Sequence, residues 1–263
     1  MRVDDPDTTR YFKATLAYDG LAYAGWQIQP EQPTVQACLE SALEQVTGQT
    51  VRVVASGRTD AGVHALGQVV SFRVATRLTA DVLQRALDAN TAEDIHVWSV
   101  TEAAAGFHAI RDAIAKRYRY TMVDGPHPDI FLRRYAWHIV QPLHVPAMHE
   151  AVRHLMGRHD FSSFEASGAP RKSSVRTVAD VEVRRITAEP VDRVVLEIEA
   201  DGFLYNMVRN IVGTAVLIGR GEYPADWMVE VLNARDRRRA GPTAPPHGLT
   251  LVRVDYAQEE KTN

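Results

Sequence analysis

The sequence has one cysteine, no long apolar run and only a small net charge. With Cys38 alone, the chain cannot form an internal disulfide or a zinc site built from several thiolates. No segment approaches the roughly 20 apolar residues of a membrane-spanning helix, so we expect no membrane association. The polar, acidic start MRVDDPDTTR is unlike a signal or transit peptide, and we therefore expect a cytoplasmic protein.

The charge that is present is distributed unevenly. The net charge is −3, but residues 1–115 carry 9 Lys and Arg against 14 Asp and Glu, whereas residues 116–263 carry 21 against 19. The later basic residues form four clusters: AKRYRY (115–120), FLRR (131–134), PRKSSVR (170–176) and RDRRR (235–239). One such cluster is typical of a solvated surface, but four together favour an anionic partner.

Two halves of the chain, residues 11–105 and 106–256, show a similar order of predicted elements. Hydrophobic periodicity predicts strands at 13–20, 51–55, 68–74, 96–103, 117–124, 178–186, 193–200 and 248–256, and helices at 33–48, 78–89, 145–157, 203–219 and 227–235. Each half approximates β-α-β-β-α-β, the ferredoxin-like or split βαβ arrangement. We predict an α+β fold of two such halves related by pseudo-two-fold symmetry, with a mainly antiparallel sheet and a central cleft. Cys38 falls on the apolar face of the first helix, which indicates a core residue.

The stretch SGRTDAGVHA (56–65) places Arg58, Asp60 and His64 in one glycine-bounded loop between two predicted strands. An aspartate before Ala-Gly is often a turn former, and Arg58 could simply pair with it. His64 is best interpreted as structural, because no second ligand stands at metal-binding spacing. We expect no metal site here. Catalysis by Asp60 is the alternative that the loop leaves open.

Arg209 is a second unusual residue, because it lies inside the apolar helix FLYNMVRNIVGTAVLIG. An unpaired buried guanidinium is very costly, so Arg209 must reach the surface by snorkelling or meet a carboxylate. The helix follows the turn EADG, which is the counterpart of the Asp60 loop in the first half. Pseudo-symmetry would then make Asp60 a natural partner for Arg209, and a paired carboxylate stays ionised near neutral pH.

Tyr118 and Tyr120 alternate with arginines in KRYRY (116–120), so one face of this strand presents two aromatic rings. Ordinary alternation in a half-buried strand explains the pattern equally well. An enzyme that modifies a base in folded RNA must extrude that base and stack it on a flat side chain, which is the functional alternative.

Several of these motifs together resemble the tRNA pseudouridine synthases that modify positions 38 to 40 of the anticodon stem-loop. The resemblance covers nearly the whole chain, about residues 11–256, and GRTDAGVHA is its most specific part. The motifs are GRTDAGVHA (57–65), FHA (107–109), RYRY (117–120), HDFSSF (159–164), FLYNMVRNIVG (203–213) and APPHGL (244–249). Two positions depart from the usual pattern: Ile110 stands where the family often has Arg, and Pro246 where Ala is usual.

The resemblance implies a homodimer that binds the tRNA anticodon stem-loop and needs no metal, nucleotide or organic cofactor. It implies that Asp60 is the catalytic aspartate and that Arg58 helps to flip and hold the target region. Tyr118 would stack on the uracil and is a candidate for removing its C5 proton. Arg209 would form a salt bridge with Asp60, and Leu249 would pack against the base.

Two other classes of protein stay open at this point. A tRNA-binding or tRNA-folding chaperone without catalysis could use the same arginines. An Asp-dependent glycosidase could use the same aspartate, but such enzymes normally need a second carboxylate as acid, and the motifs contain no obvious one.

Overall fold

The computed structural model describes residues 9–168 and 173–257. The chain divides into two compact units. Unit 1 comprises the residues up to Ile114 together with those from Leu251 onward, and unit 2 comprises Ala115–Thr250. Within the described residues, no helix is both long enough and apolar enough to span a membrane.

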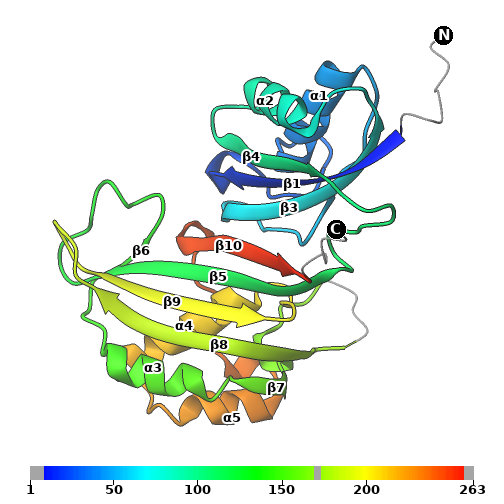
Figure 1. Cartoon of the computed structure of the whole chain (residues 1–263). Coiled ribbons are helices and arrows are strands. Elements are labelled where there is room, and N and C mark those ends of the chain that lie inside the picture. The colour runs from blue at the N-terminus through cyan, green and yellow to red at the C-terminus, as the bar shows by residue number, and fades with distance from the viewer. Residues whose placement is uncertain (1–8, 169–172, 258–263) are drawn as a thin grey trace. The chain divides into compact units, whose positions relative to one another are not determined.

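Unit 1 is an antiparallel sheet with two helices on one face (Figure 1). Its elements are β1 (Thr9–Tyr18), the 3-10 helix η2 (Gly20–Ala22), α1 (Val35–Thr47), β2 (Val54–Ala55), β3 (His64–Ala75), α2 (Ala80–Asn90), β4 (Ile95–Glu102) and most of β10 (Leu249–Tyr256). The strand order is β4-β1-β3-β10, with the short β2 also pairing with β3. The order β4-β1-β3-β2 is that of a split βαβ unit.

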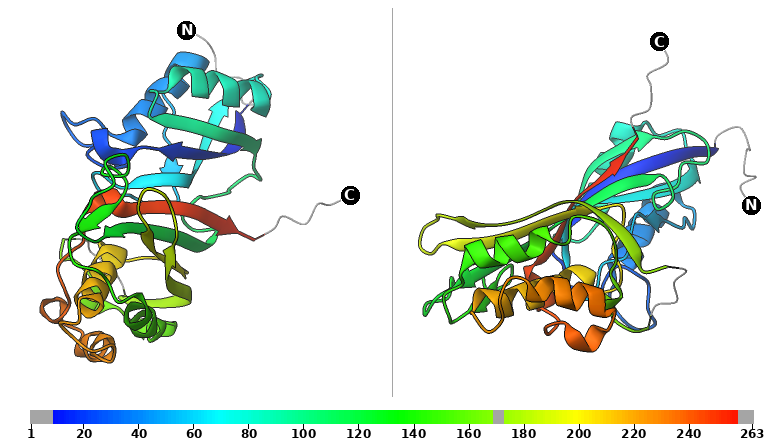
Figure 2. Two further views of the ribbon diagram at one scale, coloured as in Figure 1. Left: turned by 90° about the vertical axis from the view of Figure 1, so that its left-hand side faces the viewer. Right: turned by 90° about the horizontal axis from the view of Figure 1, so that it is seen from below.

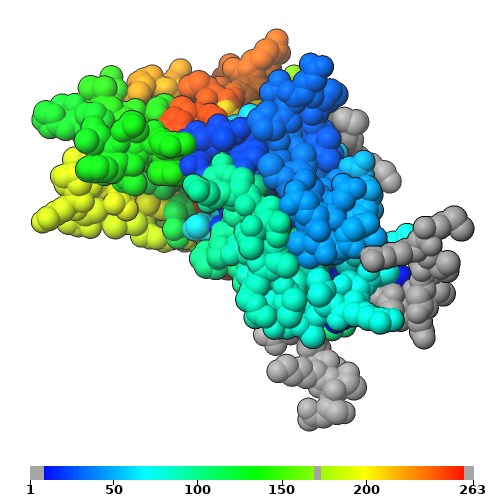
Figure 3. Space-filling model, turned by 90° about the horizontal axis from the view of Figure 1, so that it is seen from above, coloured from blue at the N-terminus to red at the C-terminus, as the bar shows by residue number. Residues whose placement is uncertain are grey.

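Helix α1 begins and ends as its sequence dictates. The side chain of Thr34 accepts a hydrogen bond from the amide of Ala37, and Gly48 ends the helix in the left-handed conformation. Its apolar face is buried against the sheet, whereas Cys38 is only half-buried. Burial raises the pKa of the Cys38 thiol, so this cysteine stays protonated. Figure 3 views the molecule from the side on which α1 and α2 lie (blue to cyan).

Unit 2 contains strands in the order β5-β9-β8-β7, each antiparallel to the next. The short β6 adds a parallel pair to β5. Its elements are β5 (Ala113–Asp124), β6 (Trp137–Ile139), α3 (Val145–Arg153), β7 (Gly157–Asp160), η3 (Ser162–Phe164), β8 (Val175–Ile186), β9 (Arg193–Ala200), α4 (Met207–Gly219), α5 (Trp227–Ala234), η4 (Arg237–Arg239) and η5 (Pro246–Gly248).

Three helices, α3, α4 and α5, pack together on one face of the unit 2 strands (Figures 1 and 2). Helix α4 is buried almost all round, as its uniformly apolar sequence predicts. The other face of the sheet carries charges: Arg117 on β5 lies opposite Glu199 on β9, and Arg119 lies opposite Glu197. The two faces therefore differ in chemistry, with aromatic and apolar side chains toward α4 and paired ions on the other side.

The predicted α+β class with a mainly antiparallel sheet is confirmed. Two helix bounds differ from the prediction by four residues, and the others by two or fewer. Helix α3 ends at Arg153, not at Gly157, because the chain turns through Leu155 and Met156 and enters β7 at Gly157 with φ +94°. Helix α4 starts at Met207, because Asn206 adopts a left-handed conformation. The short strands β6 and β7 were not predicted.

Candidate active site

The Asp60 loop connects β2 to β3, and buried polar side chains of unit 1 hydrogen-bond to its residues. The hydroxyl of Ser56 donates to Oε1 of Gln68 at 2.7 Å, and Nε2 of Gln68 donates to the carbonyl of Gly57 at 2.9 Å. The hydroxyls of Tyr18 and Thr59 lie 2.8 Å apart. Burial raises the pKa of Tyr18 to about 12, so this phenol stays protonated at neutral pH.

The segment after β1 clamps the same loop from one side. The amide of Trp26 donates to the carbonyl of Thr59 at 3.0 Å. Gly25 has φ +102°, and a Cβ there would lie 2.7 Å from the carbonyl oxygen of Thr59. Only glycine permits this approach of the two backbones. The residue before Asp60 is therefore fixed through both its side chain and its backbone.

Asp60 itself is half-buried, and its backbone carbonyl accepts from the amide of Val63 at 3.1 Å. Arg58 is exposed. His64 is buried, with Nδ1 3.1 Å from the amide nitrogen of Gly20 and 3.2 Å from Oδ1 of Asp19. These contacts agree with a structural role for His64. The loop thus presents Arg58 and Asp60 at its surface while its base is rigid.

Tyr118 and Tyr120 lie on the same face of β5 in unit 2, and both are buried. The ring of Tyr118 meets Phe203 edge to face, with centroids 5.0 Å apart. The hydroxyl of Tyr120 donates to the carbonyl of Pro245 at 2.7 Å. Gly248 lies directly against the Tyr120 ring, and a Cβ there would come within 2.6 Å of it. Leu249, also buried, follows at the start of β10.

The guanidinium of Arg209 on α4 is oriented by its neighbours in unit 2. Its Nε donates to the carbonyl of Ala244 at 2.8 Å, and one terminal nitrogen donates to Oδ1 of Asn206 at 2.9 Å. The backbones of the two residues are also hydrogen-bonded, because the amide of Ala244 donates to the carbonyl of Arg209 at 3.1 Å. The side chain is half-buried and does not simply extend into solvent.

The predicted site residues are thus divided between the units. Arg58 and Asp60 belong to unit 1, and Tyr118, Arg209 and Leu249 belong to unit 2. Within each unit the predicted residues sit on well-braced segments. The salt bridge between Asp60 and Arg209 joins residues of different units and stays a prediction.

The arginine clusters are largely engaged within the chain. Arg117 contacts Glu199 at 2.9 Å, Asp180 at 2.7 Å and Glu197 at 3.3 Å, and Arg119 contacts Glu197 at 2.6 Å. The interpretation of AKRYRY as an anion-binding cluster is therefore not supported.

The later clusters differ from one another. In PRKSSVR, residues 170–172 lie outside the described residues, and Arg176 donates to the carbonyls of Ser173 and Val175. In RDRRR, Arg238 pairs with Asp236 at 2.7 Å, and Arg235 lies 3.5 Å from Asp160.

Comparison with known proteins gives the family of the chain. The family model described as tRNA pseudouridine synthase matches residues 14–110 and 151–257. A tRNA pseudouridine synthase A from Moorella thermoacetica is 47% identical over 246 residues, covering 93% of this chain and 98% of the relative. The chain belongs to the tRNA pseudouridine synthase family. It is an isomerase that acts on tRNA, so the chaperone and glycosidase alternatives are set aside.

Other relatives of the synthase show the same extent of similarity. The tRNA pseudouridine synthase A of Brevibacillus brevis is 44% identical over 244 residues, covering 93% of this chain and 98% of the relative. The tRNA pseudouridine synthase A of a Thermoanaerobacter species is 42% identical over 241 residues, covering 92% of this chain and 97% of the relative. Among solved structures, a Cbf5-Nop10-Gar1 complex matches with a TM-score of 0.34 and 12% identity, over 91% of this chain and 57% of that chain.

The sequence did not reveal the residues that brace the synthase's Asp60 loop. Gln68 is fully buried and contacts Ser56 and Gly57. Its signal was available, because a glutamine at the start of the predicted buried strand QVVSFRV needs hydrogen-bond partners. Asn210 and Arg237, which hold the segment next to Arg209, were also missed.

Proposed function

We propose that this synthase isomerises uridine to pseudouridine at positions 38, 39 and/or 40 of the tRNA anticodon stem-loop, with Asp60 as its catalytic carboxylate. The observation that carries the proposal is the bracing of the Asp60 loop. Thr59 is held by Tyr18 and by the amide of Trp26, so the carboxylate next to it is presented on a rigid base. A preorganised group that needs no rearrangement during the reaction is what catalysis favours.

The reaction breaks the N1–C1′ bond of uridine and joins C5 to C1′. C5 loses its proton and N1 gains one, so atoms and electrons balance without a cofactor. An ionised Asp60 near C1′ can form a glycosyl ester, or it can remove a proton from C2′ to give a glycal. Both routes require that the detached uracil stays bound while it rotates.

The remaining roles follow the motifs of the family. Tyr118 stacks on the uracil and is the candidate for removing the C5 proton, and Leu249 packs against the ring. Their burial in unit 2 supports a dry surface for a base. Arg58, which is exposed, helps to flip and hold the target region. Arg209 pairs with Asp60, and the fixed position of its guanidinium supports this role.

Four broader features belong to the same proposal. The enzyme acts as a homodimer on each tRNA, it works in the cytoplasm, and its ferredoxin-like halves are residues 11–105 and 106–256. It acts without a cofactor.

The decisive experiment replaces Asp60 with Asn, which keeps the size of the side chain and removes its charge. We expect the release of tritium from C5-labelled uridine in tRNA to fall at least a thousand-fold, while the Kd for tRNA changes less than about threefold. Asp81→Asn, a change of an exposed carboxylate on α2 of the same unit, serves as the control and should leave both unchanged. If Asp60→Asn retained a tenth of the wild-type rate, Asp60 would not be the catalytic carboxylate.

A further inference from the structure

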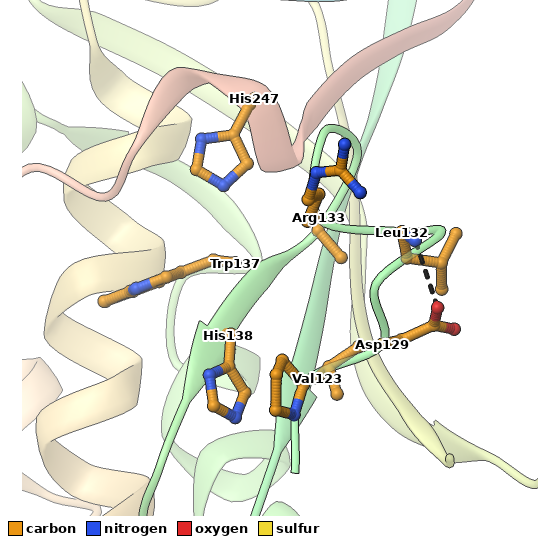
Figure 4. A pocket seen from close by; sticks show the side chains of 9 residues that line it. Val123, Asp129, Leu132, Arg133, Trp137, His138 and His247 are labelled. Carbon is orange, nitrogen blue, oxygen red and sulfur yellow. Dashed lines mark hydrogen bonds between the residues drawn. The ribbon is translucent and has the colours of Figure 1, made fainter. Parts of the chain in front are cut away.

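A hollow of about 260 Å3 opens within unit 2 (Figure 4). It lies between β5, β6, the segment 128–136 and η5. Its lining includes the indole of Trp137, the imidazoles of His138 and His247, and the guanidinium of Arg133. Figure 4 shows His247 and His138 on either side of Trp137, with Arg133 near His247. None of these four residues has a part in the reaction described above.

The walls of the hollow are fixed by hydrogen bonds. Oδ1 of the buried Asp129 accepts from the amides of Phe131 at 2.9 Å and Leu132 at 3.1 Å, which sets the turn that carries Arg133. Nε2 of His138 donates to the carbonyl of Gly125 at 2.8 Å. The hollow is therefore formed before any ligand arrives, as small-molecule sites usually are.

The lining offers flat rings and one cation. The ring of His247 hydrogen-bonds to the backbone of Ala136, and burial lowers its pKa, so this imidazole is neutral at neutral pH. Asp129 is engaged by the two amides of its own turn, and Arg133 is exposed. Aromatic faces beside an arginine are the groups with which proteins bind unstacked bases of single-stranded RNA. A space below about 300 Å3 fits one ring system better than a larger ligand.

The hollow shares two segments with the proposed uracil pocket. The Trp137 ring meets Tyr120 edge to face at 6.4 Å, and Tyr120 lies on the same face of β5 as Tyr118. His247 lies on the short segment that runs from Pro245, which Tyr120 binds, to Leu249. His247 in the lining is thus two residues from Leu249, so a nucleotide next to a uridine bound at Leu249 can reach the hollow.

We propose that this hollow binds a second, unstacked nucleobase of the tRNA, from a nucleotide near the target uridine, with Arg133 beside its phosphate. The proposal rests on the proposed function only in the placement of the target uridine at Tyr118 and Leu249. Stacking on Trp137 and His247 holds this base and so helps to keep the loop open while the uridine is bound. Recognition by stacking tolerates different bases, because every base has a flat face.

The test uses binding, so that it does not depend on catalysis. Anticodon stem-loop RNAs with one abasic ribose at each loop position in turn, the target uridine intact, are titrated against the wild-type enzyme, His247→Ala and Arg133→Ala. We expect one abasic position to weaken wild-type binding about five- to hundred-fold. The same abasic RNA should bind His247→Ala no more weakly than the complete RNA does, because the partner of the missing base is already gone.

Arg133→Ala and Arg158→Ala form a matched pair. Both remove one exposed arginine from unit 2, but only Arg133 lines the hollow. Arg133→Ala should weaken binding of the complete RNA at least fivefold, and Arg158→Ala less than twofold.

Should His247→Ala fail to fold, Trp137→Phe in the same abasic series replaces it, with a smaller expected loss at the same position. Equal effects of the two arginine changes, or an abasic penalty of full size in the His247 variant, would overturn the proposal. A failure of the Asp60 experiment would leave these binding results unaffected.

Discussion

The side-chain oxygen of Asn210 accepts a hydrogen bond from the guanidinium of Arg237 at 2.9 Å. The same oxygen accepts from the hydroxyl of Thr243 at 2.7 Å, and the Asn210 nitrogen donates to the carbonyl of Phe164 at 2.8 Å. Asn210 is fully buried. This amide therefore ties α4 to the segment that ends at Ala244, whose carbonyl orients Arg209.

Arg237→Ala should lower the stability of the synthase, although it belongs to a cluster that looks like an RNA-binding surface. The change leaves the buried Asn210 oxygen with one donor fewer, which costs about 1–3 kcal/mol. Arg238→Ala is the control, because the Arg238 side chain is 89% exposed and solvent screens its pair with Asp236, so this change should leave the stability unaltered. Urea denaturation monitored by circular dichroism measures both. If Arg238→Ala lowered the free energy of unfolding more than Arg237→Ala, the hydrogen bond from Arg237 to Asn210 would not be the one that stabilises this segment.

Gly213→Ala tests how tightly α4 packs on the segment 241–244. In an open helix this change would stabilise by about 1 kcal/mol. Here the new Cβ would lie 1.7 Å from the carbonyl oxygen of Pro242, so the backbone must shift, and we expect the free energy of unfolding to fall by about 3 kcal/mol or more. At Gly202 the nearest atom to an added Cβ is 3.4 Å away, and Gly202→Ala should change stability by less than about 1 kcal/mol. A Gly213→Ala variant more stable than the wild type would contradict the close packing of α4 on the segment 241–244.

Tyr18→Phe tests the brace beneath Asp60. The change removes the hydroxyl that meets Thr59 at 2.8 Å and Gln68 at 3.4 Å, and it should cost about 1–2 kcal/mol of stability. With the loop less rigid, kcat should fall about tenfold while the Kd for tRNA stays within a factor of two. Tyr11→Phe on the same strand is the control, because its hydroxyl has no hydrogen-bond partner within the described residues. Equal kcat values for the two variants would show that the hydrogen bonds of Tyr18 do not contribute to catalysis.

Asp124 and Arg185 give unit 2 a stability that depends on pH. The two side chains form paired hydrogen bonds of 2.7 and 2.9 Å, and the amide of Leu143 donates to the same carboxylate at 2.7 Å. Burial alone would raise the pKa of Asp124, but these donors outweigh it and hold the pKa below its usual value. The contribution is therefore complete above the unfolded pKa of about 3.9 and is lost as the pH falls through the lower folded pKa.

The measurement is the thermal melt of Asp124→Asn between pH 7 and pH 3. The variant should melt below the wild type at pH 7, and the difference should narrow below about pH 4, where Asp124 of the unfolded chain takes up a proton before Asp124 of the folded protein does. Asp226→Asn changes a side chain that is 85% exposed and should melt with the wild type throughout. A difference between Asp124→Asn and wild type that stayed constant down to pH 3 would show that the charge of Asp124 does not matter.

The sequence predicted the long elements well, because their patterns are local. Strand β9 and the apolar α4 follow directly from runs of hydrophobic residues, and the Asp60 loop is marked by its glycines. Charge pairing could not be predicted in this way. Arg117 is neutralised by Glu199, which lies far away in the sequence and meets it only because β5 and β9 pair in that register. Strand β6 is too short to show a period.

The first unit is discontinuous in the sequence, because its strand next to β3 is β10. During synthesis on the ribosome, the nascent chain up to Ile114 therefore lacks a partner for the part of this edge of β3 that β2 does not pair, until β10 has left the exit tunnel. That edge offers unpaired backbone groups in the meantime. A shortened chain that ends before Leu249 would keep the Asp60 loop but lose the strand that completes its sheet, so truncation from the far end of the gene disturbs the part of the enzyme that is translated first.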